Sequence, residues 1–143
     1  MARTLFADTA FWVALLNRRD HHHHRALAWN EYVVASSTSI ATTEAVLWEW
    51  LNGCSTPNVR QKAAEGYRRC HEDPQLEVTG FAPHLIESAM GLYQERHDKE
   101  WSLTDCLSFV VMEDRQLTDA LTTDHHFEQA GFRALLLTDP PDG

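Results

Sequence analysis

The stretch Leu5-Phe-Ala-Asp8-Thr-Ala-Phe-Trp-Val-Ala-Leu-Leu16 carries the clearest structural pattern in this chain. Its first residues, together with Thr4, form a short apolar run that predicts a buried strand ending at Asp8. Thr9 follows as a candidate helix cap. The next apolar side chains are spaced so that they share one helix face: Phe11, Trp12, Leu15 and Leu16. The stretch therefore predicts a strand, an acidic residue at its end, and then a helix.

The rest of the chain continues this alternation of apolar runs and helical periodicity. Further strands are predicted at residues 33–36, 76–81, 120–122 and 134–137. Helices are predicted at residues 20–32, 41–51, 57–70, 83–96, 102–116 and 126–129. Continuous apolar strands separated by helices are typical of a parallel sheet covered on both faces. We therefore expect an α/β fold, a three-layer α/β/α sandwich with a mostly parallel central sheet of about five strands.

Length and composition indicate one packed domain. The chain has 143 residues, 43% of them hydrophobic, and no linker or repeat divides it. We expect a single domain over residues 1–138 and a flexible tail over 139–143, which reads Asp-Pro-Pro-Asp-Gly. An odd number of cysteines without a CxxC motif favours a reduced, cytoplasmic setting. The apolar start is too short to span a membrane, so no membrane association is expected.

The net charge restricts the possible functions. It is −9 at neutral pH. Because neutralisation of phosphates dominates affinity for nucleic acids, this charge argues against a tight, metal-free nucleic-acid binder. It argues less against a nuclease, because acidic metal ligands would account for part of the excess.

Four carboxylates, far apart in the chain, fall at predicted junctions between strands and helices. Asp8 follows the first strand and Asp124 follows the fourth, while Glu44 and Asp105 lie in the first turns of two helices. In open α/β sheets these junctions share the edge at the carboxyl ends of the strands. Several negative charges at one edge repel each other unless a divalent cation lies between them. The pattern therefore predicts a site for a hard cation bound by oxygen ligands.

Each acid also has a purely structural interpretation. Ser102-Leu-Thr-Asp105 matches a helix capping box, and Asp124 can be a simple N-cap. Glu44 can be a solvated acid stabilised by the dipole of its helix. Asp8 is the hardest to explain in this way, because its apolar neighbours would bury a carboxylate without a partner, which is costly.

Four segments containing these acids resemble the motifs of PIN-domain nucleases. Residues 5–16 resemble the opening motif of that family, and the other three are Thr42-Thr-Glu44-Ala-Val-Leu, Ser102-Leu-Thr-Asp105-Cys-Leu-Ser-Phe and Leu121-Thr-Thr-Asp124-His-His-Phe. Their order and spacing match, and the resemblance covers essentially the whole chain. It implies a PIN-like fold and an RNA-cleaving enzyme that depends on Mg²⁺ or Mn²⁺. Small members of the family are often VapC-type toxins that are held by an antitoxin protein and assemble as homodimers.

The resemblance also implies a role for each acid. Asp8 and Asp105 would be the principal metal ligands. Glu44 would hold a metal-bound water or orient the nucleophile, and Asp124 would complete the ligand shell or help to bind a second ion. The RNA target and the number of ions stay open.

Two other functions are compatible with parts of the sequence. One is a catalytically silent PIN-like module that binds a protein or RNA, although intact acids at all four positions argue against it. The other is a response-regulator-like or phosphatase domain with an aspartyl nucleophile. That class needs a second acid beside the strand-end aspartate and a late lysine, whereas the only lysines here are Lys62 and Lys99.

Several other residues can be interpreted structurally or functionally. We interpret the run His21–His24 as a solvated helix start rather than a metal site, and His125 and His126 as surface or capping residues. Trp48 and Trp50 are two positions apart on a predicted helix, so we expect one in the core and the other on a partner surface. Candidate phosphate contacts are Arg18, Arg19, Arg25, Arg60, Lys62, Arg68 and Arg69.

Overall fold

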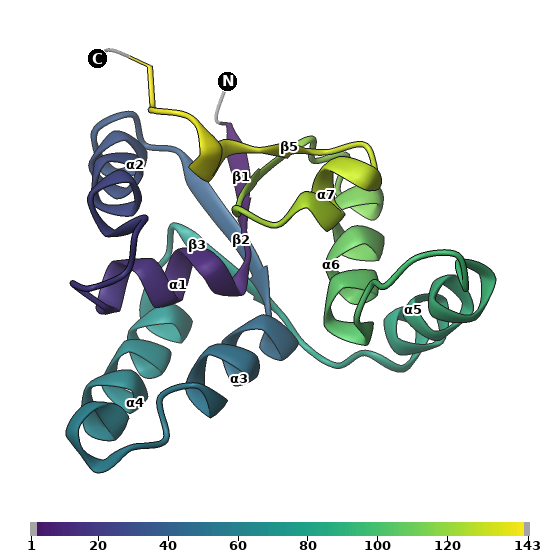
Figure 1. The fold of residues 1–143 in the computed structure, drawn as a ribbon, viewed down its shortest axis with the longest axis horizontal. Coiled ribbons are helices and arrows are strands. Elements are labelled where there is room, and N and C mark those ends of the chain that lie inside the picture. The colour runs from purple at the N-terminus through teal and green to yellow at the C-terminus, as the bar shows by residue number, and fades with distance from the viewer. Residues whose placement is uncertain (1–2, 142–143) are drawn as a thin grey trace.

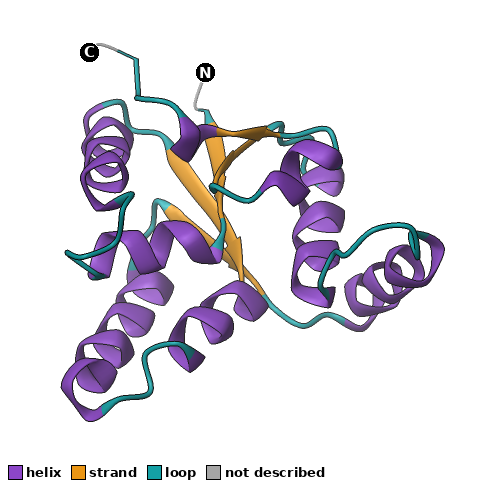
Figure 2. Ribbon diagram, viewed as in Figure 1, coloured by secondary structure: helices purple, strands orange, loops and turns teal. Residues whose placement is uncertain are grey.

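The computed structural model describes residues 3–141, which fold around a five-stranded sheet in the order β3-β2-β1-β4-β5 (Figures 1 and 2). Every strand pairing is parallel. The strands are β1 (Thr4–Ala7), β2 (Ser39–Thr43), β3 (Leu76–Thr79), β4 (Asp119–Leu121) and β5 (Arg133–Ala134). The expected class of fold and the parallel sheet are confirmed.

Helices cover both faces of the sheet. Figure 1 shows α1, α2 and α4 on one side and α5, α6 and α7 on the other. The helices are α1 (Thr9–Leu16), α2 (His23–Ala35), α3 (Glu44–Asn52), α4 (Pro57–Glu72), α5 (Pro83–Glu95), α6 (Leu103–Asp114) and α7 (His125–Gln129). The chain leaves β1 towards β2 but leaves β4 towards β5, so the strand order reverses between β1 and β4. Ligands of open α/β sheets bind at the carboxyl ends of the strands at such a reversal.

The predicted strand at residues 33–36 is wrong, because these residues end α2 and the second strand is β2. Consecutive valines favour a strand locally, but Val33 is buried while Val34 is 72% exposed, as on an amphipathic helix. The helix predicted from residue 41 begins later, at Glu44. Thr43 caps it by accepting a hydrogen bond from the backbone N–H of Val46 at 3.1 Å.

The predicted strand at 134–137 is also mostly wrong. β5 ends at Ala134, and Leu135–Leu137 form a short 3₁₀ helix. Leu135 and Leu136 are buried there, so the apolar run reflects burial rather than strand conformation. The remaining predicted elements exist, with ends that differ by a few residues.

The core immobilises the elements that carry the acids. Leu5, Phe6 and Ala7 of β1 are fully buried. Phe109 of α6 lies at the centre of an aromatic cluster, with ring centroids 4.9–5.7 Å from those of Trp101, Phe127 and Phe132. These contacts fix α6 and α7 relative to each other. They therefore fix the starts of both helices, where Asp105 and Asp124 lie.

The two tryptophans of α3 differ as the sequence predicts. Trp50 is 4% exposed and Trp48 is 55% exposed. α4 passes so close to Trp50 that a Cβ added at Gly66 would lie 2.9 Å from the indole Cη2. Glycine at this position therefore allows the close contact between α3 and α4. Trp48 packs against Phe81 at a centroid distance of 5.4 Å, on the surface.

A charged cluster joins the amino-terminal edge of the sheet. Asp119, at the start of β4, is buried and accepts two hydrogen bonds from the Arg133 guanidinium, at 2.7 and 2.8 Å. Arg3 also pairs with it. These contacts connect the start of β1, β4 and β5 far from the candidate site.

Both the C-terminal segment and the histidine run make contacts with the first two helices. The end of the expected tail, residues 142–143, lies outside the described residues, while Asp139 pairs with Arg25 at 3.0 Å. The run His21–His24 lies at the start of α2, where the Nδ1 atom of His23 is 2.6 Å from the carbonyl oxygen of Ala14. Within residues 3–141, none of the helices has the length and apolarity that crossing a membrane requires.

Candidate active site

Asp8 lies where β1 ends, next to the reversal of strand order. Its backbone N–H donates to the Leu121 carbonyl at 3.2 Å, so Asp8 extends the pairing of β1 with β4. Its side chain is buried and accepts a hydrogen bond from the Thr122 hydroxyl at 2.8 Å. Burial raises the pKa of Asp8 to about 7, and the negative charges of Asp105 and Asp124 add to the effect.

Asp105 is both a helix cap and a neighbour of the other acids. Its backbone N–H donates to the Ser102 hydroxyl at 3.0 Å, and its Oδ2 accepts from the Ser102 backbone N–H at 3.2 Å. The predicted capping box is therefore present. The same Oδ2 lies 3.1 Å from the Nδ1 atom of His126. Among the described residues Oδ1 accepts no hydrogen bond, so capping leaves one oxygen available.

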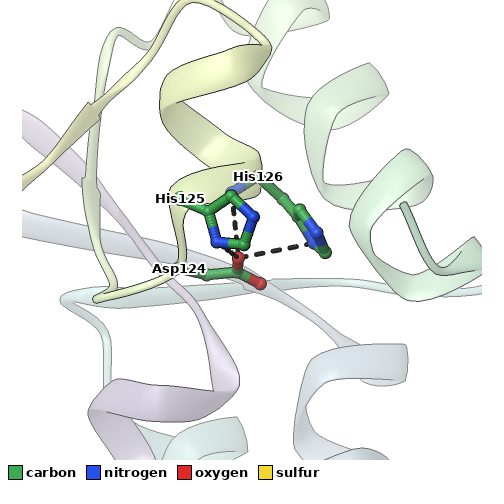
Figure 3. Close-up of side chains that lie close together, drawn as sticks. All are labelled: Asp124, His125 and His126. Carbon is green, nitrogen blue, oxygen red and sulfur yellow. Dashed lines mark hydrogen bonds and ion pairs between the residues drawn. The ribbon is translucent and has the colours of Figure 1, made fainter. Parts of the chain in front are cut away.

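Asp124 also caps a helix, and its carboxylate lies beside His125 and His126 (Figure 3). Its Oδ1 accepts from the backbone N–H of His126 at 2.9 Å, and its own backbone N–H donates to the Thr122 hydroxyl at 3.0 Å. Thr122 therefore connects Asp124 to Asp8. Within residues 3–141, one group of three metal-ligating side chains has ligand atoms within 4.8 Å of one another: Asp124, His125 and His126.

Glu44 differs from the three aspartates. It lies in the first turn of α3, as expected, and is the first residue of that helix. Both of its carboxylate oxygens contact α4. Oε1 lies 2.6 Å from the Nε2 atom of His71, and Oε2 accepts from the Tyr67 hydroxyl at 2.8 Å. Hydrogen bonds thus link Asp8, Asp105 and Asp124 through Thr122 and His126, whereas Glu44 is held by another helix. That Glu44 shares a cation with them stays a prediction.

Four residues near these acids were not assigned a place in the site from the sequence. Thr122 and His126 connect the aspartates, and Tyr67 and His71 contact Glu44. His126 was interpreted as a surface or capping residue, and only the surface position is wrong. Its side chain is only 18% exposed and contacts Asp105. The first residue of α7 is exposed and the second is not, so the His126 side chain faces Asp105. No sequence pattern indicated a place in the site for Tyr67 or His71.

The aspartate cluster suits a divalent cation. Among residues 3–141, no lysine or arginine forms an ion pair with Asp8, Asp105 or Asp124. A cation that binds beside a buried carboxylate offsets the repulsion from the negative charges around it. Carboxylate oxygens favour hard divalent cations, whereas the neighbouring imidazoles favour softer ones such as zinc.

Comparison with known proteins gives the same picture. The family model for the PIN domain matches residues 5–133. The chain belongs to the PIN-domain family. Membership in this family agrees with the resemblance of the four acidic segments, and it replaces the response-regulator-like alternative.

This PIN domain is similar to several characterised proteins. It is 28% identical over 131 residues to the 23S rRNA-specific endonuclease VapC20 of Mycobacterium tuberculosis, which covers 90% of this chain and 95% of the relative. The crystal structure of VapC20, described as a sarcin-ricin loop cleaving toxin, matches with a TM-score of 0.79 and 27% identity over 92% of this chain and 98% of that chain.

More distant structures share the fold. FitAcB from Neisseria gonorrhoeae matches with a TM-score of 0.64 and 17% identity, covering 91% of this chain and 94% of the other. VapBC2 from Rickettsia felis, bound to a DNA fragment from its promoter, matches with a TM-score of 0.63 and 17% identity, covering 89% and 92%.

Proposed function

We propose that this PIN domain is a Mg²⁺- or Mn²⁺-dependent endoribonuclease and the toxin of a toxin–antitoxin pair. The observation that carries the proposal is the buried carboxylate of Asp8, linked through Thr122 and His126 to Asp124 and Asp105 at the reversal of strand order. The similarity to VapC20, a 23S rRNA-specific endonuclease, supports RNA as the substrate.

The site residues have distinct parts in this proposal. Asp8 and Asp105 hold the cation, Asp124 completes the ligand shell, and Glu44 acts at a bound water. The bound cation supplies a water of lowered pKa and polarises the scissile phosphate. Thr122 keeps Asp8 and Asp124 in register, because its hydroxyl donates to one and accepts from the other.

Substrate binding must overcome the acidity of the chain. α4 carries a set of basic side chains, and we propose that they contact RNA phosphates: Arg60, Lys62, Arg68 and Arg69. Such contacts weaken as salt rises. The protein should therefore cleave RNA best at low ionic strength.

The proposed partners are an antitoxin protein and a second copy of the chain. Two of the similar structures are of VapBC proteins, from Rickettsia felis and Salmonella typhimurium. The exposed Trp48 and Phe81 lie on an apolar surface that includes Ile86 and Leu103. Tryptophan on such a surface is typical of protein interfaces. We further propose that residues 1–138 act as one nuclease domain in the cytoplasm.

Cleavage assays with a chelator and an isosteric variant test the function. The substrate is a synthetic sarcin-ricin-loop RNA, chosen because the VapC20 structure is described as that of a toxin that cleaves this loop. We expect cleavage with Mg²⁺ or Mn²⁺, none in EDTA, and a loss of about 100-fold or more in Asp8→Asn. Asp114→Asn, an exposed residue at the end of α6, is the matched control and should remain active.

Two outcomes would contradict the proposal. Cleavage in EDTA, or full activity in Asp8→Asn, would show that the acids serve the structure alone. RNA binding without cleavage under any metal condition would instead favour the catalytically silent module.

A further inference from the structure

The contacts of Glu44 suggest a role for α4 that family membership does not assign. Tyr67 and His71 are four residues apart on α4 and therefore face the same way. Their rings pack at a centroid distance of 4.8 Å. Each reaches a different oxygen of Glu44, at 2.8 and 2.6 Å. The carboxylate is thereby fixed in both position and rotation.

The packing of α4 against α3 makes this arrangement rigid. Gly66, next to Tyr67, lies against the ring of Trp50, and Trp50 is buried six residues after Glu44 on α3. Trp50 in turn packs on Trp12 of α1, at a centroid distance of 6.1 Å. The distance between α4 and the part of α3 that carries Trp50 is therefore set by core packing. Flexible surface side chains do not decide it.

The hydrogen bonds that Glu44 accepts limit how it can act. A carboxylate has about four acceptor positions, two on each oxygen. Tyr67 and His71 occupy one on each oxygen, which leaves one on each for another donor. A water is such a donor. The three aspartates are linked to one another without Glu44, so a cation bound by them does not require this carboxylate as a direct ligand.

We propose that Tyr67 and His71 are positioning residues for the nuclease reaction, and that they hold Glu44 so that it orients a water in the site instead of ligating the cation. The inference rests on the proposed function. It assigns Glu44 a role different from that of the other acids. Asp8 and Asp105 determine how tightly the cation binds, whereas Glu44 and its two partners determine how fast bound RNA is cleaved.

Two measurements on the intact protein separate these roles. One is the Kd for Mn²⁺ alone, measured by calorimetry without RNA. The other is kcat for cleavage of the synthetic sarcin-ricin-loop RNA at saturating Mn²⁺. We expect Tyr67→Phe and His71→Ala to lower kcat about 10–100-fold, since small misplacements of reacting groups have effects of this size. The Kd for Mn²⁺ should change less than about threefold, whereas altering a partner of a direct ligand changes metal affinity about 10–100-fold.

A conservative variant and two controls complete the design. His71→Gln places an amide N–H near the position of Nε2, so it should recover most of the kcat that His71→Ala loses. Tyr93→Phe and His97→Ala remove the same groups from exposed positions on and just after α5 and should leave both quantities unchanged. Thermal unfolding of each variant shows whether it is folded.

The outcomes distinguish this inference from the proposed function. Weakening of Mn²⁺ binding by tenfold or more in His71→Ala or Tyr67→Phe would make Glu44 a direct ligand and overturn the inference. Unchanged kcat in Tyr67→Phe and His71→Ala would overturn it as well. If Asp8→Asn bound Mn²⁺ as tightly as the wild type, the proposed function would fail, and the inference with it.

Discussion

Replacing Asp8 with Asn should stabilise the metal-free protein while abolishing its activity. Asp8 is 6% exposed, and its pKa rises from 3.8 to about 7 in the folded state, mainly because of burial. Each pKa unit corresponds to about 1.4 kcal/mol, so ionised Asp8 opposes folding by about 4 kcal/mol above pH 7. Asn carries no charge and fills nearly the same volume.

The hydrogen bond from Thr122 lowers the pKa of Asp8, so the value of about 7 already includes it. Asn keeps a neutral version of this hydrogen bond through its carbonyl oxygen. We therefore expect a net stabilisation of up to about 4 kcal/mol at pH 8.

The effect must depend on pH in a definite direction. The folded protein binds the Asp8 proton more tightly than the unfolded chain does, because the folded pKa is the higher one. Ionisation of Asp8 therefore begins to oppose folding above about pH 4, and its effect grows until pH passes about 7. At pH 4 the variant should have no advantage over the wild type.

Urea denaturation in EDTA, at pH 8 and at pH 4, measures this difference. Asp114→Asn, at an exposed acid, is the control and should change stability by less than about 0.5 kcal/mol. Saturating Mn²⁺ should stabilise the wild type and leave Asp8→Asn unaffected. If Asp8→Asn were less stable than the wild type at pH 8, or if the difference were the same at both pH values, the reasoning about its buried charge would be refuted.

Two further substitutions test contacts away from the site. Asp119→Asn should lower the free energy of unfolding by about 1–3 kcal/mol at pH 7, since it weakens the contacts with Arg133. The arginine partners hold the pKa of Asp119 below its usual 3.8, so its contribution is complete above about pH 4 and should disappear in urea titrations as pH falls below that value. Gly66→Ala should destabilise by about 1 kcal/mol, because crowding against Trp50 costs about 1–3 kcal/mol and better helix propensity returns about 1 kcal/mol. Gly91→Ala on α5, where a Cβ meets nothing within 4 Å, should instead be stabilising, and equal thermal shifts for the two glycine variants would contradict the close contact at Gly66.

Both the early strand–helix unit and the parallel sheet could be predicted from the sequence, because their patterns are local. Apolar residues fill β1 after Thr4, and the periodicity of α1 follows at once. The position of Asp8 between them follows from that pattern alone. Capping of α6 by Ser102 and Asp105 is likewise a local interaction within four residues, and it is present.

The features that could not be predicted depend on contacts between residues far apart in the chain. The pair Val33-Val34 favours a strand locally, but contact of one helix face with the core keeps both residues in α2. His126 was placed on the surface because nothing near it in sequence shows that Asp105 lies beside it. Glu44 lies in the first turn of its helix, as predicted, yet its partners, Tyr67 and His71, come from a helix whose distance depends on Gly66 and Trp50.

Local sequence and tertiary packing therefore determine different aspects of how the acids are arranged. Local sequence determines that carboxylates stand at the ends of strands and the starts of helices, because strand and helix signals adjoin them. Which carboxylates share hydrogen-bonding partners is decided by packing. Thr122 can join Asp8 to Asp124 only because β1 and β4 pair side by side, and local sequence does not show which distant strands become neighbours.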